Sequence, residues 1–273
     1  MPTISWFDGS SEKRRPPDAA EIAPVIRPSR ILDARVDAGR REEMLERILE
    51  LALEGRFARV YFANVHMVDA ASKDTRLREA LDEADLVCPD GMPLVRLLQL
   101  AEGTTDRSEG MSVFPLLLSR AEDLDIPVAL FGSTPAVLAL VSDKIRQDHP
   151  GLRIVASIAP PFGPELALGE PRHHHLLRES GAKLVFVALG CPQQELWIQR
   201  VRNVPACFLG VGNALEVYVG LRKRAPQWAR ALALEWLFRL WEEPRRLAPR
   251  YFSSNIRFLL RLPGWIVFRP GRK

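Results

Sequence analysis

The sequence predicts an α/β fold, a Rossmann-like parallel sheet with helices on both faces, and two observations support this. From about residue 40 to residue 213, helical and strand patterns alternate along the chain. The strand segments are continuously apolar, as in "LVFVAL" at 184–189, instead of alternating between apolar and polar residues. Such strands are typically buried on both sides, so we expect amphipathic helices to cover both faces of the sheet.

The alternation begins with a predicted helix over 39–55, which has helical periodicity and ends at Gly55. A strand at 58–65, a helical stretch through 69–84 and a strand at 85–91 follow. The remaining predicted elements are helices at 112–124, 135–150, 173–181 and 193–203, separated or followed by strands at 126–133, 152–160, 182–192 and 205–213.

The alternation stops at Gly220, and the rest of the chain reads as helices punctuated by prolines. We therefore expect a flexible leader at 1–28, an α/β domain at 29–219 and a helical C-terminal appendage at 220–273. The leader has no apolar core of signal-peptide length. No run approaches the ~18 apolar residues of a membrane-spanning helix.

The net charge of +4 conceals an asymmetry between the two ends of the chain. Residues 220–273 contain 13 Lys and Arg against 3 Asp and Glu, and four of the six tryptophans, whereas residues 1–219 are net acidic. A basic, tryptophan-rich segment is typical of contact with an anionic and partly apolar partner. Arginines at 239, 246, 250, 257 and 261 would form one stripe on a continuous helix, but Pro244 and Pro249 predict an interrupted one.

No metal site is predicted. Cys88, Cys191 and Cys207 lie far apart beside apolar runs, as expected of reduced, buried thiols. The three histidines at 173–175 point in different directions on a helix, which favours a surface position. The "DLD" stretch at 123–125 precedes a strand and therefore lies at the amino end of the sheet.

Several predicted strands end in polar residues or glycine. These are Asn64, Asp90, Gly132, the stretch from Gly190 to Glu195, and Gly210, Gly212 and Asn213. Each alone is typical of a turn, and "PDG" at 89–91 is a common surface-turn composition. In a parallel sheet, however, they meet at the carboxyl edge, where open α/β sheets bind ligands and helix N-termini suit a nucleotide diphosphate. "GVGNAL" has Leu215 at the sixth position of the dinucleotide fingerprint, which disfavours NAD binding.

A further set of stretches resembles one family, the WecG/TagA/CpsF glycosyltransferases. They follow the family's order from about residue 30 to 260: "ANVHMVDAA", "ADLVCPDGMPLV", "IAPPFGP", "LVFVALGCPQQELWI", "LGVGNALEVYVGLRKRAPQW" and "LEWLFRLWEEPRRLAPRY". The resemblance implies an inverting, metal-independent enzyme without a cofactor. Such enzymes transfer a sugar from a UDP-sugar to a polyprenyl-diphosphate-linked saccharide at the inner face of the bacterial cell membrane, in cell-surface or exopolysaccharide synthesis.

The resemblance also implies roles for individual residues. Asp90 is the expected general base. The residues expected to bind substrate are Asn64, Arg107, Gly132, Gly190, Gln194, Glu195, Gly212, Arg224, Arg239, Arg246 and Arg250. The appendage is expected to close over the site and to contact the membrane. Self-association occurs in the family and is left open here, and no nucleic-acid partner is expected.

Three departures from the family pattern leave the substrates open. Phe62 stands where Thr is frequent, Ser112 where Asp is usual, and Leu215-Glu216 where Phe-Asp is common. The donor sugar is therefore undecided among N-acetylmannosamine, its uronic acid, glucose and glucuronic acid. Two other readings remain: a non-catalytic nucleotide- or membrane-binding homologue, and a nucleotide-dependent oxidoreductase.

Overall fold

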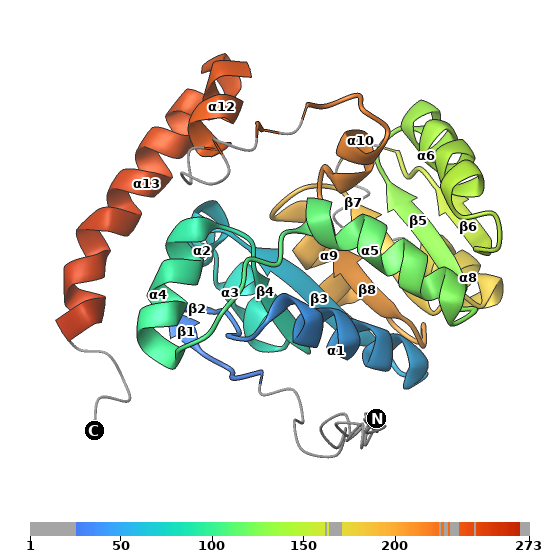
Figure 1. Ribbon diagram of the computed structural model, residues 1–273, viewed down its shortest axis with the longest axis horizontal. Helices are drawn as coiled ribbons and strands as arrows, with labels where there is room; N and C mark the ends of the chain where they lie inside the picture. The colour runs from blue at the N-terminus through green and yellow to red at the C-terminus, as the bar shows by residue number, and fades with distance from the viewer. Residues whose placement is uncertain are drawn as a thin grey trace, which may run out of the picture.

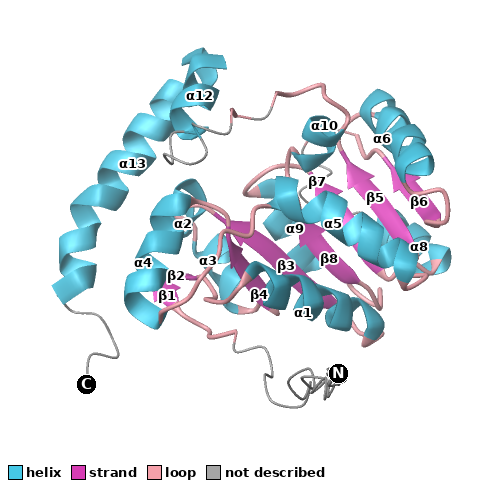
Figure 2. Cartoon of the chain, viewed as in Figure 1, coloured by secondary structure: helices cyan, strands magenta, loops and turns pink. Residues whose placement is uncertain are grey.

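A computed structural model of the chain describes residues 26–161, 163, 171–223, 225–226, 229, 235–242 and 244–267. Within them, helices cover both faces of a six-stranded parallel sheet, which confirms the predicted Rossmann-like α/β class (Figure 1; Figure 2). Most of the expected leader, residues 1–25, lies outside the described residues. The division at residues 28 and 219 stays a prediction.

The central sheet has the strand order β4-β3-β8-β7-β5-β6, and every neighbouring pair is parallel. Its strands are β3 (Ala58–Ala63), β4 (Leu86–Pro89), β5 (Val128–Gly132), β6 (Ile154–Ile158), β7 (Leu184–Ala188) and β8 (Cys207–Gly210). The register places Ala63 of β3 level with Pro89 of β4. The residues that follow these two strands, Asn64 and Asp90, therefore leave the same edge of the sheet side by side.

Two apolar clusters fill the space between the sheet and its helices. One receives side chains from α2 (Val65–Ala71), α3 (Thr75–Asp82), α4 (Met92–Glu102), α8 (Pro171–Ser180) and α9 (Gln193–Arg200). The other receives them from α1 (Arg41–Leu53), α5 (Gly110–Asp123), α6 (Pro135–Asp148) and α10 (Ala214–Tyr218). Trp197 stacks on Phe131 in the first cluster, with ring centroids 4.0 Å apart.

Several elements differ from the sequence prediction. The helical stretch at 69–84 is two helices, because the Asp74 side chain accepts a hydrogen bond from the Arg76 amide at 3.0 Å and caps a new helix. The helices α4 and α10 and the small antiparallel pair β1 (Arg30–Ile31) and β2 (Ala34–Arg35) were not predicted. The predicted surface position is wrong for His173, which is buried with its ring 5.4 Å from that of Phe131.

The appendage contributes α12 (Glu235–Glu242) and α13 (Pro244–Val267). The predicted interruption at Pro249 is wrong, because α13 continues through this residue. Pro249 is the sixth residue of the helix, so its missing N–H removes a single backbone bond near the start. The 18 residues that follow include Phe258, Leu262 and Trp265, which pack against the α/β body. This packing stabilises α13 although proline disfavours a helix interior.

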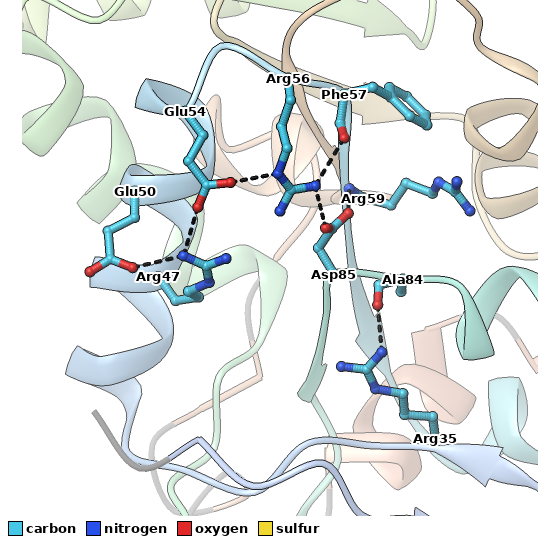
Figure 3. A network of polar contacts seen from close by, with 9 residues as sticks. All are labelled: Arg35, Arg47, Glu50, Glu54, Arg56, Phe57, Arg59, Ala84 and Asp85. Atoms are coloured by element: carbon cyan, nitrogen blue, oxygen red, sulfur yellow. Dashed lines mark hydrogen bonds and ion pairs between the residues drawn. The ribbon is translucent and has the colours of Figure 1, made fainter. Parts of the chain in front are cut away.

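An ion-pair network joins the end of α1 to the starts of β3 and β4 (Figure 3). Arg56 binds Glu54 at 2.5 Å and Asp85 at 2.6 Å, and Asp85 also accepts the Arg59 amide at 2.8 Å. This network lies at the amino edge of the sheet. Asp125 of the "DLD" stretch precedes β5 at the same edge and pairs with Arg153 at 2.8 Å.

Asp37 covers the outer edge of β4, the strand that leads to Asp90. Its buried carboxylate accepts the Val87 amide at 2.8 Å and the Arg35 guanidinium at 2.9 and 3.1 Å, and its own amide donates to the Val87 carbonyl. Both outward backbone groups of Val87 are thereby satisfied, which protects an otherwise open strand edge. Burial raises the pKa of Asp37, although the bonds from Arg35 oppose that rise.

We predict that Asp37→Ala lowers the free energy of unfolding by about 3 kcal/mol, because the Val87 amide and the Arg35 guanidinium lose their buried acceptor. Urea unfolding followed by circular dichroism measures the loss. Asp82→Ala is the matched control, since Asp82 pairs with Arg30 in an exposed bridge worth about 1 kcal/mol or less. Equal stabilities for the two variants would contradict the role assigned to Asp37.

Candidate functional site

Asn64 and Asp90 lie together at the carboxyl edge of the sheet. The Asp90 amide donates to the carbonyl of Ala63 at 2.7 Å, so the turn after β4 is bonded to the end of β3. A Cβ placed on Gly91 would lie 3.7 Å from the Cβ of Asn64, which shows how closely the two turns approach. The Asn64 side chain accepts the Met67 amide at 3.1 Å and thereby caps α2. Both Asn64 and Asp90 are half-buried.

The segment between α4 and α5 brings Arg107 to the same place. Its Nε donates to the carbonyl oxygen of Asp90 at 2.8 Å, and the Ser108 amide donates to the carbonyl of Pro89 at 2.9 Å. The Arg41 guanidinium in turn binds the Arg107 carbonyl at 2.8 and 3.0 Å. Arg107 is therefore fixed next to Asp90 by contacts at both its side chain and its backbone.

Gln194 connects the turns that follow β7 and β8. Its Oε1 accepts the amides of Gly190 at 3.2 Å and Gly212 at 3.0 Å. Its Nε2 donates to the carbonyl of Gly210 at 2.9 Å and to the carboxylate of Glu195 at 2.8 Å. Two acceptor and two donor positions are the whole capacity of a side-chain amide. The described contacts of the buried Gln194 and Glu195 therefore hold the turns after β7 and β8 together.

The glycines predicted to bind substrate have conformational reasons to be glycine. Gly132 has a φ of +105°, and a Cβ there would lie 2.5 Å from the carbonyl oxygen of Ala188, so β5 and β7 approach this closely only without a side chain. Gly190 and Gly212 have φ values of +78° and +57°, which L-residues rarely adopt. Binding of substrate by these glycines stays a prediction.

The edge has two separate parts. Adjacent strands lie about 4.8 Å apart, so Asp90 after β4 is roughly 10 Å from the turn after β8 and roughly 14 Å from the turn after β7. The helices α4, α6 and α9 begin at this edge, and the start of α5 packs against the Val211 backbone and Phe62. Their amino ends carry partial positive charge. The helix N-termini along the edge therefore suit an anionic ligand, whereas a carboxylate such as Asp90 is suited to accept a proton.

The appendage docks on the flank of α2. Arg257 of α13 binds the carboxylate of Asp69 at 2.9 and 2.7 Å, and Lys73 binds it at 2.7 Å. Burial acts to raise the pKa of Asp69, but the bonds from Arg257 and Lys73 outweigh it and lower the pKa. Phe258 of α13 is buried in the cluster that also contains Met67 of α2. The sequence reasoning missed this contact, although an aspartate on the apolar "VHMVDAA" stretch was a signal for it.

Other contacts of α13 extend this docking. Arg261 pairs with Asp33, and the Trp265 indole donates to the carbonyl of Arg30 at 3.2 Å. Of the arginines predicted to bind substrate, Arg224 lies outside the described residues. Arg239, Arg246 and Arg250 lie on α12 and α13, but their side chains are outside the described part. Their role stays a prediction.

The three departures from the family pattern occupy defined positions. Phe62 is buried, with its ring 3.5 Å from where a Cβ on Gly110 would lie. The Ser112 hydroxyl donates to Glu109 at 2.5 Å. Glu216 pairs with Arg222 at 3.0 Å.

Cys88 and Cys207 are buried within strands, and burial raises the pKa of both thiols. No group of three His, Cys, Asp or Glu side chains among the described residues is placed to hold a metal ion. Of the helices described, none combines the length and hydrophobicity required to cross a membrane.

The fold and this edge define an α/β protein whose ligand site lies at the carboxyl ends of parallel strands. Comparison with family models then gives its class: the model of the glycosyl transferase WecG/TagA/CpsF family matches residues 29–271. The chain belongs to this family and is therefore a glycosyltransferase of cell-surface polysaccharide synthesis, with a nucleotide-sugar donor and a saccharide acceptor. The match extends through the appendage, so α12 and α13 are part of the family's common chain.

We predict that Gln194→Leu lowers the free energy of unfolding by at least about 2 kcal/mol, because the backbone groups of Gly190, Gly210 and Gly212 lose their partner. Hydrogen exchange should show faster exchange of the Gly190 and Gly212 amides. The neighbouring Gln193 is exposed, and Gln193→Leu is the control. Unchanged protection of both amides in Gln194→Leu would contradict the bonds assigned to the Gln194 side chain.

Proposed function

We propose that this chain is an inverting, metal-independent glycosyltransferase that moves a sugar from a UDP-sugar to a polyprenyl-diphosphate-linked saccharide at the inner face of the cytoplasmic membrane. The observation that supports this most is the position of Asp90 at the carboxyl edge. The Asp90 amide is bonded to the end of β3, and the Asp90 carbonyl is bonded to Arg107. Family membership supplies the reaction class, and these two backbone bonds fix the turn from which the Asp90 side chain extends.

In this proposal Asp90 is the general base. The acceptor hydroxyl attacks the anomeric carbon from the face opposite the leaving UDP, and Asp90 takes its proton as the new bond forms. One displacement inverts the anomeric configuration and needs one base. Positioned proton transfer of this kind contributes about 10²- to 10⁴-fold to the rate.

The departing diphosphate gains negative charge, which cations and backbone N–H groups stabilise. Arg107 lies beside Asp90, and α4, α6 and α9 direct their amino ends at the same edge. Guanidinium groups suit phosphate because their N–H donors match pairs of phosphate oxygens. Arg224, Arg239, Arg246 and Arg250 of the appendage are proposed to add to this charge.

The outer face of α13 supports contact with a membrane surface. Its inward face holds Phe258 against the body, whereas the exposed face carries Ile256, Leu259, Leu260 and Ile266 at helical spacing. Leu260 is 75% exposed, and Trp241 on α12 is 87% exposed. Exposed leucine and tryptophan on helices whose sequence is rich in arginine are typical of a segment that lies in the membrane interface. The lipid-linked acceptor would be reached from that surface.

We predict that Asp90→Asn lowers the turnover number by about 10²- to 10⁴-fold while the Kd for UDP stays unchanged, because only the base is removed. The donor is first identified by product analysis with UDP-N-acetylmannosamine, its uronic acid, UDP-glucose and UDP-glucuronic acid on a polyprenyl-diphosphate-linked acceptor. Calorimetric titration then measures UDP binding.

Asp143→Asn is the control for Asp90→Asn, since Asp143 lies in an exposed pair with Arg146 on α6. Full turnover by Asp90→Asn would reject the base assignment. A wild-type chain that binds UDP without transferring any sugar of the panel would favour the non-catalytic homologue.

We predict that the double variant Leu259→Ser/Leu260→Ser weakens binding to vesicles of anionic phospholipid by at least about tenfold, because two exposed leucines no longer enter the interface. Vesicle co-sedimentation measures this. Leu53→Ser is the control, since Leu53 is 60% exposed on α1, which is remote from α13 (Figure 1). Equal binding by the wild type and both variants would show that the outer face of α13 does not contact the membrane.

A further inference from the structure

Glu109 is a buried acid that lies against Arg107, the residue bonded to the turn of Asp90. Its carboxylate pairs with the Arg107 guanidinium at 2.5 Å and accepts the Ser112 hydroxyl at 2.5 Å. The Glu109 side chain is 5% exposed and that of Arg107 is 17% exposed. The pair is therefore largely shielded from water, where a charge interaction is stronger than at the surface.

The geometry of Arg107 connects this acid to Asp90. A guanidinium is planar, so fixing two of its nitrogens fixes the plane. In Arg107 the NH2 nitrogen binds Glu109 and the Nε nitrogen binds the Asp90 carbonyl at 2.8 Å. One guanidinium thus forms an ion pair with Glu109 and a hydrogen bond with the turn that carries Asp90.

Glu109 also lies at the N-cap position of α5. A negative charge there is stabilised by the amino end of the helix. The next residue, Gly110, packs so closely that a Cβ would lie 3.3 Å from the Val211 carbonyl oxygen and 3.5 Å from the Phe62 ring. The start of α5 is therefore packed between β3 and the turn after β8. This packing fixes the backbone position from which the Glu109 side chain extends.

Glu109 is poorly suited to be the base itself. Its carboxylate is already engaged by the guanidinium of Arg107 and the hydroxyl of Ser112. Its near-complete burial also leaves little room for an acceptor hydroxyl.

We propose that Glu109 is a positioning residue, which orients Arg107 and through it the Asp90 turn for the transfer reaction. This inference rests on the proposed function for its consequence in catalysis, but its structural part is independent of any substrate. It also accounts for Ser112, which stands where the family pattern has Asp. Here the negative charge is that of Glu109, and the Ser112 hydroxyl donates to it.

The experiment compares Glu109→Gln with Glu109→Gln/Ser112→Asp. Because the Ser112 hydroxyl already reaches the Glu109 carboxylate, an aspartate at 112 returns a negative charge to the same place. Glu122→Gln is the matched control, since Glu122 lies at the other end of α5 and bonds His149 and the Gly151 amide. Circular dichroism confirms that each variant is folded.

Two readouts are measured. The first is the turnover number and KM with the UDP-sugar that the panel identifies. The second is the exchange protection of the Arg107 Nε–H in ¹⁵N NMR spectra, assigned with Arg107→Lys. We expect Glu109→Gln to lower the turnover number by about 10- to 100-fold with a much smaller change in KM, because a base held slightly out of place slows the chemical step. The Nε–H signal should lose protection, and both effects should reverse in the double variant.

Wild-type turnover or unchanged Nε–H protection in Glu109→Gln would overturn the inference. So would a double variant that recovers neither, since the returned charge would then have no positioning effect. If the wild-type chain transfers no sugar, the proposed function fails, and the Nε–H protection alone decides whether Glu109 positions Arg107.

Discussion

The common direction of the six strands is the constraint on which the rest of this structure depends. Because all neighbouring pairs are parallel, every strand delivers its following residue to one edge. Residues as far apart in the chain as Asn64 and Gly212 therefore share a surface. The level register of β3 and β4 then brings Asn64 and Asp90 into one bonded turn region, and Arg107 is added from the segment before α5. An antiparallel sheet would divide these residues between opposite edges.

Much of this was readable from the sequence, because it follows from short-range patterns. Continuous apolar runs identified the buried strands, and the residues just after them identified the edge. The hydrogen-bond and ion-pair partners of those residues could not be predicted from the sequence. Whether Gln194 faces a ligand or the backbone of two turns depends on strand order, which no local pattern specifies. The pairing of Glu109 with Arg107 likewise depends on the path of a loop, and α4 was missed because its apolar run follows a turn signal directly.

In the appendage, too, the sequence pattern indicated the element but not the contacts of its side chains. The spacing of its arginines indicated a helical face, but two of them point inward: Arg257 reaches Asp69, and Arg261 reaches Asp33. A helix with charged and apolar contacts on its inner side still exposes leucines on its outer side. The inner face of α13 thus binds the α/β body, and its outer face is left exposed to solvent. Docking on α2 places this helix next to the element that Asn64 caps.

The four bonds of Gln194 have a consequence for substitutions in the turns after β7 and β8. A single amide braces two turns from adjacent strands, so an alteration at either turn disturbs both. That stretch is a poor place to introduce diversity. Phe62, Ser112 and Glu216 lie outside the brace, on β3, α5 and α10, and each has partners of its own. Of the three, Glu216 is the position where substitutions would disturb the scaffold least, because Phe62 is buried in the core and Ser112 bonds Glu109.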